Sequence, residues 1–359
     1  MKFILFDSIL ERHLAESLKR SLEFLGHEVI FTDLILHGHS MVNSKKDIDF
    51  MWEKVREICS DSADMLISFR PMNLLPEMVE FIGKRMKTAI WLSDDPVLYK
   101  TCYGKVVDSY DILLHCGYCD VMNFYEKNGH PKGFNFPFWT DHISFPIVYN
   151  PLNTEYDIAF LGNMNGQVRR KRYMELASLP YSKKVFGLLD SDPLGIHGGF
   201  IREAYLHTER VSEVLSKAKV GLSIPQFFSE YNGLDYDFPG LADLGYFQFP
   251  SRVIQYAASG LPVAAIGDNR MQEAFPEIFV ASSIRDLNPY ISKITNDYDF
   301  AMAESERVLD RFQKNFSALS RAMMLIDLCE NTQSLMNKTT QQRSLLFLNY
   351  QAVYSPGVY

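Results

Sequence analysis

Residues able to bind an anion occur together in the stretch SRVIQYAASGLPVAAIG, where Arg252 and Gln255 stand three positions apart. The stretch has the pattern of a short helix, capped by Ser251 and ended by Gly260, that leads into a buried strand. Residues three apart share one helical face, and a helix N-terminus carries a partial positive charge and free N–H groups. Arg252 adds a full charge in the first turn, so this end is expected to bind a phosphate or pyrophosphate.

A second polar turn, Gly162-Asn163-Met164-Asn165-Gly166, follows a predicted strand and precedes Arg169. Glycines let a backbone approach a phosphate closely, and an arginine on the next helix can reach its oxygens with two parallel hydrogen bonds. A solvated, basic helix start explains the same pattern without any ligand. The turn therefore supports anion binding only in combination with Arg252.

Candidates for a general base follow two predicted strands in the first half of the chain. Asp94 and Asp95 come after one strand in Trp91-Leu-Ser-Asp-Asp-Pro96, and His115 ends the next. A carboxylate or an imidazole at such a position can take the proton of an acceptor hydroxyl. A helix cap with a turn explains either aspartate equally well, and a histidine satisfied within the fold is the simpler explanation for His115.

Two further motifs favour structural interpretations. Cys116-Gly-Tyr-Cys119 has no second Cys-x-x-Cys in the chain, and a zinc site would need one. Asp190-Ser-Asp192 is followed by proline and glycine and is typical of a turn. We therefore expect no metal ion and no resident cofactor.

The elements that must position these residues alternate along the chain. Predicted strands in the first half are Lys2–Phe6, His27–Phe31, Met65–Phe69, Thr88–Leu92, Asp111–Leu114 and Lys132–Phe138, with amphipathic helices between them. The alternation starts again with predicted strands at Tyr156–Leu161, Lys184–Leu188, Lys219–Ile224 and Val263–Ile266. This pattern is typical of α/β proteins with parallel, doubly wound sheets, so we expect two Rossmann-like domains facing across a cleft.

Turn-rich and helical segments set the expected boundaries. The stretch Ser144–Glu155 carries two prolines and is typical of a linker, and the long tract Pro225–Phe249 is expected to line the cleft. Ala301–Met336 has a long helical pattern. The expected parts are a first domain at 1–145, a second domain at 146–300 and a C-terminal helical segment at 301–359.

The composition narrows the partners and the compartment. Of 359 residues, 47% are hydrophobic, and a formal net charge of -8 argues against a nucleic-acid surface. No apolar run reaches the ~18 residues that a membrane span needs, and the apolar start is too short for a signal peptide. Five cysteines without framework spacing suit a reducing compartment, so a cytoplasmic protein is expected. Nothing in the sequence indicates the oligomeric state.

The stretch SRVIQYAASGLPVAAIG, with Glu273 further on, resembles the donor-site segment of GT-B glycosyltransferases. It is most similar to the spore-maturation-protein (CgeB-like) branch, which also carries a tryptophan and Asp-Pro element like Trp91–Pro96. The resemblance implies a GT-B fold whose C-terminal helix crosses back to the first domain. It further implies metal-independent transfer of a sugar from a nucleotide-diphosphate donor, UDP-sugar above all, to an acceptor hydroxyl on a glycan, protein or small molecule.

The resemblance also implies roles for the candidate residues. The donor side comprises Gly162, Asn163, Arg169, Ser251, Arg252, Gln255 and Glu273, and the acceptor side comprises Asp94, Asp95 and His115. Two glutamates of the family are replaced here by Phe247 and Gln255. Because the second of these glutamates holds the nucleotide ribose in the family, the alternative is a nucleotide-sugar-binding protein that has lost turnover.

Overall fold

The computed structural model describes residues 1–7, 12–33, 45–69, 74–93, 95–96, 99, 103–164, 167–187, 191–199, 208–225 and 249–353. The described residues form two compact units. The first contains residues 1–137 and 318–350, and the second contains residues 138–225, 249–317 and 351–353. The chain thus passes from the first unit to the second after Pro137 and returns after Ser317.

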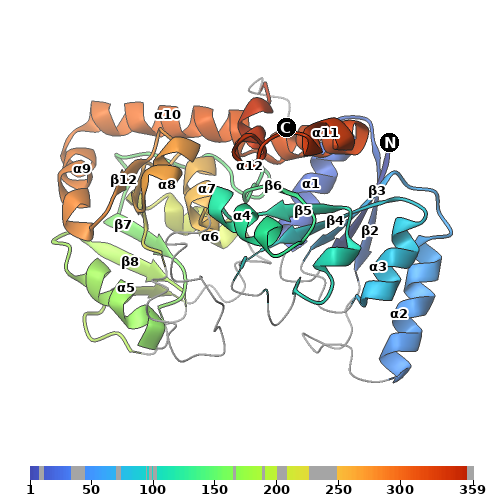
Figure 1. Cartoon of the computed structure of the whole chain (residues 1–359). Coiled ribbons are helices and arrows are strands. Elements are labelled where there is room, and N and C mark those ends of the chain that lie inside the picture. Colours follow the sequence, from blue (N-terminus) through green and yellow to red (C-terminus); the bar gives the residue numbers. More distant parts are fainter. Residues whose placement is uncertain are drawn as a thin grey trace. The chain divides into compact units, whose positions relative to one another are not determined.

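The first unit is built on a six-stranded sheet in the order β2-β1-β3-β4-β5-β6, and every registered pair is parallel. Its strands are β1 (Lys2–Asp7), β2 (Glu28–Asp33), β3 (Met65–Phe69), β4 (Lys87–Leu92), β5 (Ile112–His115) and β6 (Gly133–Asn135). Its helices are α1 (Arg12–Phe24), α2 (Lys45–Ile58), α3 (Pro76–Gly83), α4 (Cys119–Lys127), α11 (Ala318–Met336) and α12 (Thr340–Ser344). Figure 1 shows this doubly wound arrangement, which confirms the predicted alternation.

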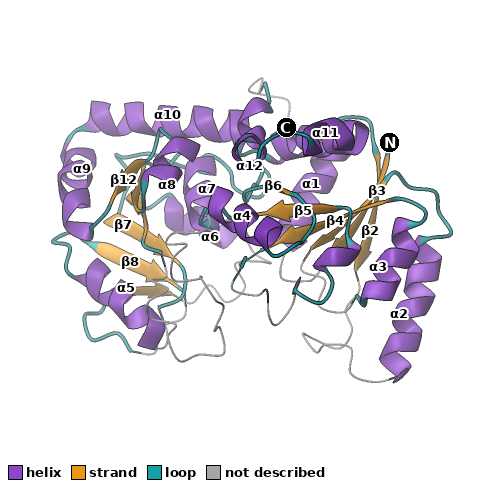
Figure 2. Ribbon diagram, viewed as in Figure 1, coloured by secondary structure: helices purple, strands orange, loops and turns teal. Residues whose placement is uncertain are grey.

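The second unit repeats the plan with a parallel sheet in the order β12-β11-β10-β7-β8-β9. Its strands are β7 (Tyr156–Leu161), β8 (Lys183–Phe186), β9 (His197–Gly199), β10 (Ala218–Ser223), β11 (Val263–Ile266) and β12 (Phe279–Ala281). Its helices are α5 (Gln167–Ala177), α6 (Thr208–Leu215), α7 (Ser251–Ala258), α8 (Asn269–Ala274), α9 (Ile284–Asn296) and α10 (Tyr298–Asn315). Figure 2 shows helices alternating with strands in this unit.

The central strands are almost entirely apolar because both faces of each sheet are covered. All five residues of β3 and all four of β11 are buried, including Ser68, the one polar residue of β3. Near-continuous apolar runs of this kind are typical of a parallel sheet between helices, which is why the sequence predicted both strands with their correct ends. Gly260 has a positive φ of 76° and directly follows the C-cap of α7, as expected for a helix end.

Several expected elements have different bounds. The strand expected at 132–138 is only Gly133–Asn135, and the helical pattern at 301–336 is two helices, α10 and α11. Ser317 lies between these helices and forms a parallel bridge with Thr140. The interruption therefore falls where the chain leaves the second unit. The sequence did not predict the short strands β9 and β12.

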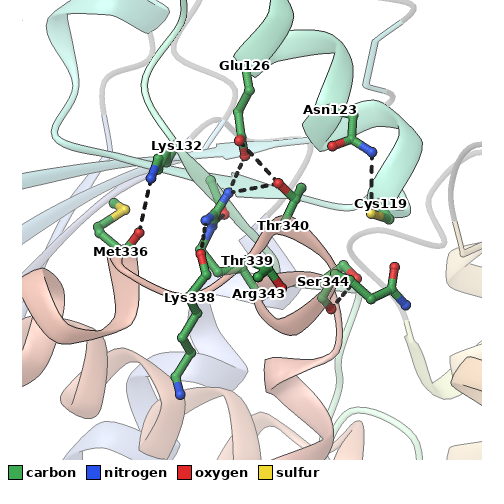
Figure 3. Close-up of polar contacts among 12 residues, drawn as sticks. Cys119, Asn123, Glu126, Lys132, Met336, Lys338, Thr339, Thr340, Arg343 and Ser344 are labelled. Atoms are coloured by element: carbon green, nitrogen blue, oxygen red, sulfur yellow. Dashed lines mark hydrogen bonds and ion pairs between the residues drawn. The ribbon is translucent and has the colours of Figure 1, made fainter.

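The C-terminal segment returns to the first unit, where α11 packs against α1 (Figure 1). Beyond it, α12 has a complete capping box between Thr339 and Gln342. Figure 3 shows Arg343 of α12 paired with Glu126 of α4, and its Nε also donates to the Gly133 carbonyl over 3.0 Å. These contacts fix the last helix on the edge of the sheet. Among the described residues, no helix has the length and apolar character needed to cross a bilayer.

Candidate functional site

The sheet of the second unit changes winding direction between β7 and β10. Successive strands β8 and β9 lie on one side of β7, whereas β10, β11 and β12 lie on the other. Ligands of open α/β sheets bind beyond the carboxyl ends of the strands at such a point. The last registered pair between the two strands is Ala159 with Gly221, before either strand ends. The strands therefore part at their carboxyl ends.

Arg252 of α7 spans the gap between the parted strands. Its Nε donates to the Leu161 carbonyl of β7 over 2.7 Å, and its Nη1 donates to the Ile224 carbonyl after β10 over 3.3 Å. The guanidinium also stands over the Phe160 ring, 5.0 Å from its centroid. Carbonyl oxygens are neutral, so these bonds orient the guanidinium without cancelling its charge. The predicted anion-binding arginine is thus fixed at the switch point.

Two glycines let backbones meet closely beside Arg252. Gly162 has a φ of 141°, and a Cβ there would stand 3.0 Å from Nη2 of Arg252. A Cβ on Gly187, after β8, would stand 2.2 Å from the Gly162 carbonyl oxygen. Only glycine satisfies both the conformation and the space at these two positions. At these two positions only backbone lies beside the guanidinium.

The end of α7 differs in detail from the prediction. Pro250, not Ser251, is the N-cap, and it makes no side-chain capping hydrogen bond. Ser251 is the first helical residue and is partly exposed, as are Arg252 and Gln255. The prediction of Ser251 as N-cap is wrong because proline, with no N–H and a fixed φ, takes the position just outside the helix. Pro250 itself therefore offers no side-chain acceptor to the first backbone N–H groups of α7.

The other donor-side candidates lie at the same strand ends or nearby. Asn163 is exposed directly after Gly162, and the side chain of Arg169 lies outside the described residues. Glu273 is exposed on α8, the helix capped by Asp268. The sequence missed Arg172, which is buried and donates to the Asn163 carbonyl over 3.1 Å. The sequence signal that could have identified Arg172 is its position in the basic run 169–172.

On the first unit, Asp95 and His115 form a buried pair. Both are 0% exposed, and Nδ1 of His115 lies 2.7 Å from Oδ2 of Asp95. Tyr125 of α4 donates to the other carboxylate oxygen, and its ring packs on the imidazole with centroids 4.7 Å apart. Burial, reinforced by the Asp95 charge, raises the pKa of Tyr125 well above its ordinary value, so the phenol remains the donor.

This pair has no surface to offer to an acceptor in the described arrangement. Asp94, the third acceptor-side candidate, lies outside the described residues, as does the tract 226–248 that was expected to line the cleft. His115 lies against Gly133, where a Cβ would stand 2.4 Å from the imidazole. Within the described part of the chain, Nε2 of His115 and Oδ1 of its registered neighbour Asn135 are buried without hydrogen-bond partners.

The described part of the Asp190–Asp192 motif forms a turn, as expected. Asp192 accepts the backbone N–H groups of Ile196 and His197 over 2.9 and 2.8 Å, which fixes the turn before β9. Cys116 is buried, and burial raises the pKa of the Cys119 thiol. No group of three or more metal-ligating side chains is present among the residues that the structure describes.

Two parallel six-stranded Rossmann-like sheets, with a C-terminal helix packed back on the first, define the GT-B fold. An α-glucosyltransferase solved in complex with UDP and a 13-mer DNA is similar over 92% of this chain and 100% of its own, with 12% identity and a TM-score of 0.62. The β-glucosyltransferase of T4 phage gives the same coverages, 13% identity and a TM-score of 0.57.

The lipopolysaccharide outer core galactosyltransferase WaaB is similar over 91% of this chain and 100% of its own, with 12% identity and a TM-score of 0.50. At such identities the similarity establishes the fold alone. No known family and no curated protein sequence matches the chain. The narrower resemblance to the CgeB-like branch therefore stays a prediction.

Proposed function

We propose that this chain is a glycosyltransferase that moves a sugar from a nucleotide-diphosphate donor, a UDP-sugar in the first instance, to an acceptor hydroxyl without a bound metal ion. The observation that carries the proposal is Arg252, held between the parted ends of β7 and β10 at the switch point. Structural neighbours solved with UDP or uridine diphosphoglucose support the choice of donor. The acceptor is a hydroxyl of a glycan, a protein or a small molecule.

In the proposed reaction the donor diphosphate lies against Arg252 and the first turn of α7. A fixed guanidinium and aligned backbone N–H groups stabilise the negative charge that develops on the leaving diphosphate. Gly162 and Gly187 keep side chains out of this space, because each has a positive φ and a crowded Cβ position. The positive charge that a divalent ion would contribute comes from the protein itself. Asn163, Arg169, Ser251, Gln255 and Glu273 complete the proposed donor side.

The test of the donor site is nucleotide binding by a matched pair of arginine variants. Wild-type protein is titrated with UDP, GDP, CDP and dTDP, with and without a chelator. A nucleotide at a hundred times its Kd stabilises the fold by about 2.7 kcal/mol, which a thermal-shift assay detects. Arg252→Met should weaken the Kd about 10- to 150-fold, because a hydrogen bond to a charged group contributes about 1.5–3 kcal/mol.

The control is Arg307→Met, which removes a 55%-exposed guanidinium on α10 of the same unit. It should leave the Kd unchanged. If no nucleotide binds the wild type, or if the two variants weaken binding equally, the donor site is not where we place it. If the chelator abolishes the nucleotide-induced rise in Tm, the metal-independent mechanism is overturned.

On the acceptor side, Asp94, Asp95 and His115 remain the proposed candidates for the base. Because Asp95 and His115 are buried and bonded to each other, Asp94→Asn is the first variant to assay. Transfer should be lost while nucleotide binding is retained. The assay compares glycan, protein and DNA acceptors. DNA is included because one structural neighbour was solved with a 13-mer DNA and another is described as a DNA modifying enzyme. The net charge of -8 leads us to expect no transfer to DNA.

The alternative is a CgeB-like protein that binds a nucleotide sugar but no longer turns it over. It is favoured by Gln255, which stands where the resembled family has a ribose-binding glutamate. The variant Gln255→Glu distinguishes an active glycosyltransferase from a binding protein that has lost turnover. A gain of transfer or of donor hydrolysis identifies a degenerate enzyme. Loss of an existing activity shows instead that the glutamine is the working residue.

A further inference from the structure

Tyr256 occupies the gap between β7 and β10 together with Arg252. Its hydroxyl accepts the Leu161 N–H over 2.7 Å and donates to the Leu222 carbonyl over 3.2 Å. The side chain is completely buried. One hydroxyl thus takes the place of the direct bond that would continue the ladder between the two strands.

The sequence makes room for this ring at one position. A Cβ on Gly221 of β10 would lie 2.4 Å from the Tyr256 ring, so any larger residue would push the ring out. Gly221 is also the last residue of β10 that is registered with β7. The ring therefore enters the sheet where the strands begin to part, and it keeps them apart.

Tyr256 and Arg252 together hold both polar groups of the Leu161 backbone. They are four positions apart on α7 and so share one helical face. The tyrosine receives the Leu161 N–H, and the arginine donates to the Leu161 carbonyl over 2.7 Å. These two groups belong to adjacent peptide units that meet at the Leu161 Cα, so the guanidinium bonds to the unit that directly follows the one Tyr256 holds. In that second unit the Gly162 N–H donates to the Phe186 carbonyl of β8 over 2.9 Å.

We infer that Tyr256 is a positioning residue of the anion site: it keeps β7 and β10 parted and holds the Leu161 N–H, which places the adjoining Leu161 carbonyl so that Arg252 points at the diphosphate. This inference rests on the proposed function for its ligand. Its geometric part, the dependence of Arg252 on Tyr256, stands independently of any nucleotide. Tyr256 itself makes no contact with the donor, since it is fully buried.

The test compares Tyr256→Phe with Tyr290→Phe. Tyr290 is a buried tyrosine of α9 in the same unit, and its hydroxyl donates to Glu304 over 3.0 Å. Both variants remove one buried hydroxyl, so both should lower the Tm. Only Tyr256→Phe should weaken the binding of UDP and of inorganic pyrophosphate, by tenfold or more at a temperature where both variants are folded. Equal affinities in the two variants would overturn the positioning role.

A second measurement is hydrogen exchange at the Leu161 amide and the Arg252 Nε–H by NMR. Both should exchange faster in Tyr256→Phe and at the wild-type rate in Tyr290→Phe. Unchanged exchange in Tyr256→Phe refutes the inference even if UDP binds. If the wild type binds neither UDP nor pyrophosphate, the proposed function fails, and the exchange rates alone decide the geometric part.

The wild type supplies a measurement if Tyr256→Phe does not fold. Saturating UDP should slow the exchange of the Leu161 amide and the Arg252 Nε–H together, because one ligand then holds the whole bonded group. Slowing of the Arg252 signal alone would show that the guanidinium responds independently of the Leu161 N–H that Tyr256 holds. That result would overturn the inference.

Discussion

Gly133→Ala should disrupt the buried pair at the carboxyl edge of the first sheet. The new methyl carbon would stand 2.4 Å from the His115 imidazole and 2.9 Å from the Leu113 carbonyl oxygen. Ordinary contacts begin at 3.4 Å, so the ring has to retreat by about 1 Å. The ring cannot do so without disturbing its 2.7 Å bond to the buried Asp95, whose other side-chain donor among the described residues is Tyr125.

The expected loss combines two costs. Overpacking a core by one methyl group costs about 1–3 kcal/mol, and weakening a hydrogen bond to a buried charge costs about 1.5–3 kcal/mol. Gly133→Ala should therefore lower the free energy of unfolding by about 2.5–6 kcal/mol, measured by urea denaturation. The matched control is Gly83→Ala at the end of α3, where a Cβ would meet nothing within 4 Å. That variant should be neutral or stabilised by up to about 1 kcal/mol.

The same substitution in a His115→Ala background tests the cause. With the imidazole gone, the nearest remaining contact is the Leu113 carbonyl at 2.9 Å, so the penalty of Gly133→Ala should fall by more than half. An equal penalty in both backgrounds would refute the argument from the His115 ring. A loss below about 1 kcal/mol in the wild-type background would refute it directly.

Two further changes test the packing of each unit. Arg343→Met leaves the partly buried Glu126 carboxylate without its guanidinium and should cost about 3–5 kcal/mol in urea denaturation. The exposed pair of Arg12 with Glu16 is the control, since Arg12→Met should cost less than about 1 kcal/mol, and equal losses would contradict the argument. Burial alone would raise the pKa of Asp157, but hydrogen bonds from Ser182 and the ion pair with Lys219 outweigh it and hold that pKa below its ordinary value. The folded state then favours the ionised form, so this stabilisation is present above pH about 4 and is lost as the pH falls through the lowered pKa. Asp157→Asn should flatten the fall in Tm between about pH 5 and 3, and an unchanged slope would rule out this source.

Elements with an unbroken apolar pattern could be predicted from the sequence with correct ends. Met65–Phe69, Tyr156–Leu161 and Val263–Ile266 are strands as expected, because strands covered on both faces are apolar at nearly every position. The short strands β9 and β12 escaped prediction because three residues carry no recognisable period. The break between α10 and α11 is also not visible in the helical pattern of the sequence. It occurs where the chain leaves the second unit and returns to the first.

At the candidate site, the sequence determined which residue types were available and where the backbone turns. Arg252 at a helix start, and glycines at strand ends, follow from local patterns that act over a few residues. Only the tertiary structure decided that Arg252 bonds to two different strands and that Tyr256 parts them. These contacts join Leu161, Leu222 and Ile224 to one helix.

The acceptor-side candidates show the same difference between what the sequence determines and what the tertiary structure decides. The sequence placed His115 at a strand end, and the strand ends there. It could not determine that α4 brings Tyr125 onto the imidazole, or that Gly133 of the next strand lies under it. Local patterns fix where an element ends because backbone geometry is a local property. Whether the residue at that end is exposed or buried depends on packing between elements that are distant in the chain, and only the folded structure brings those together.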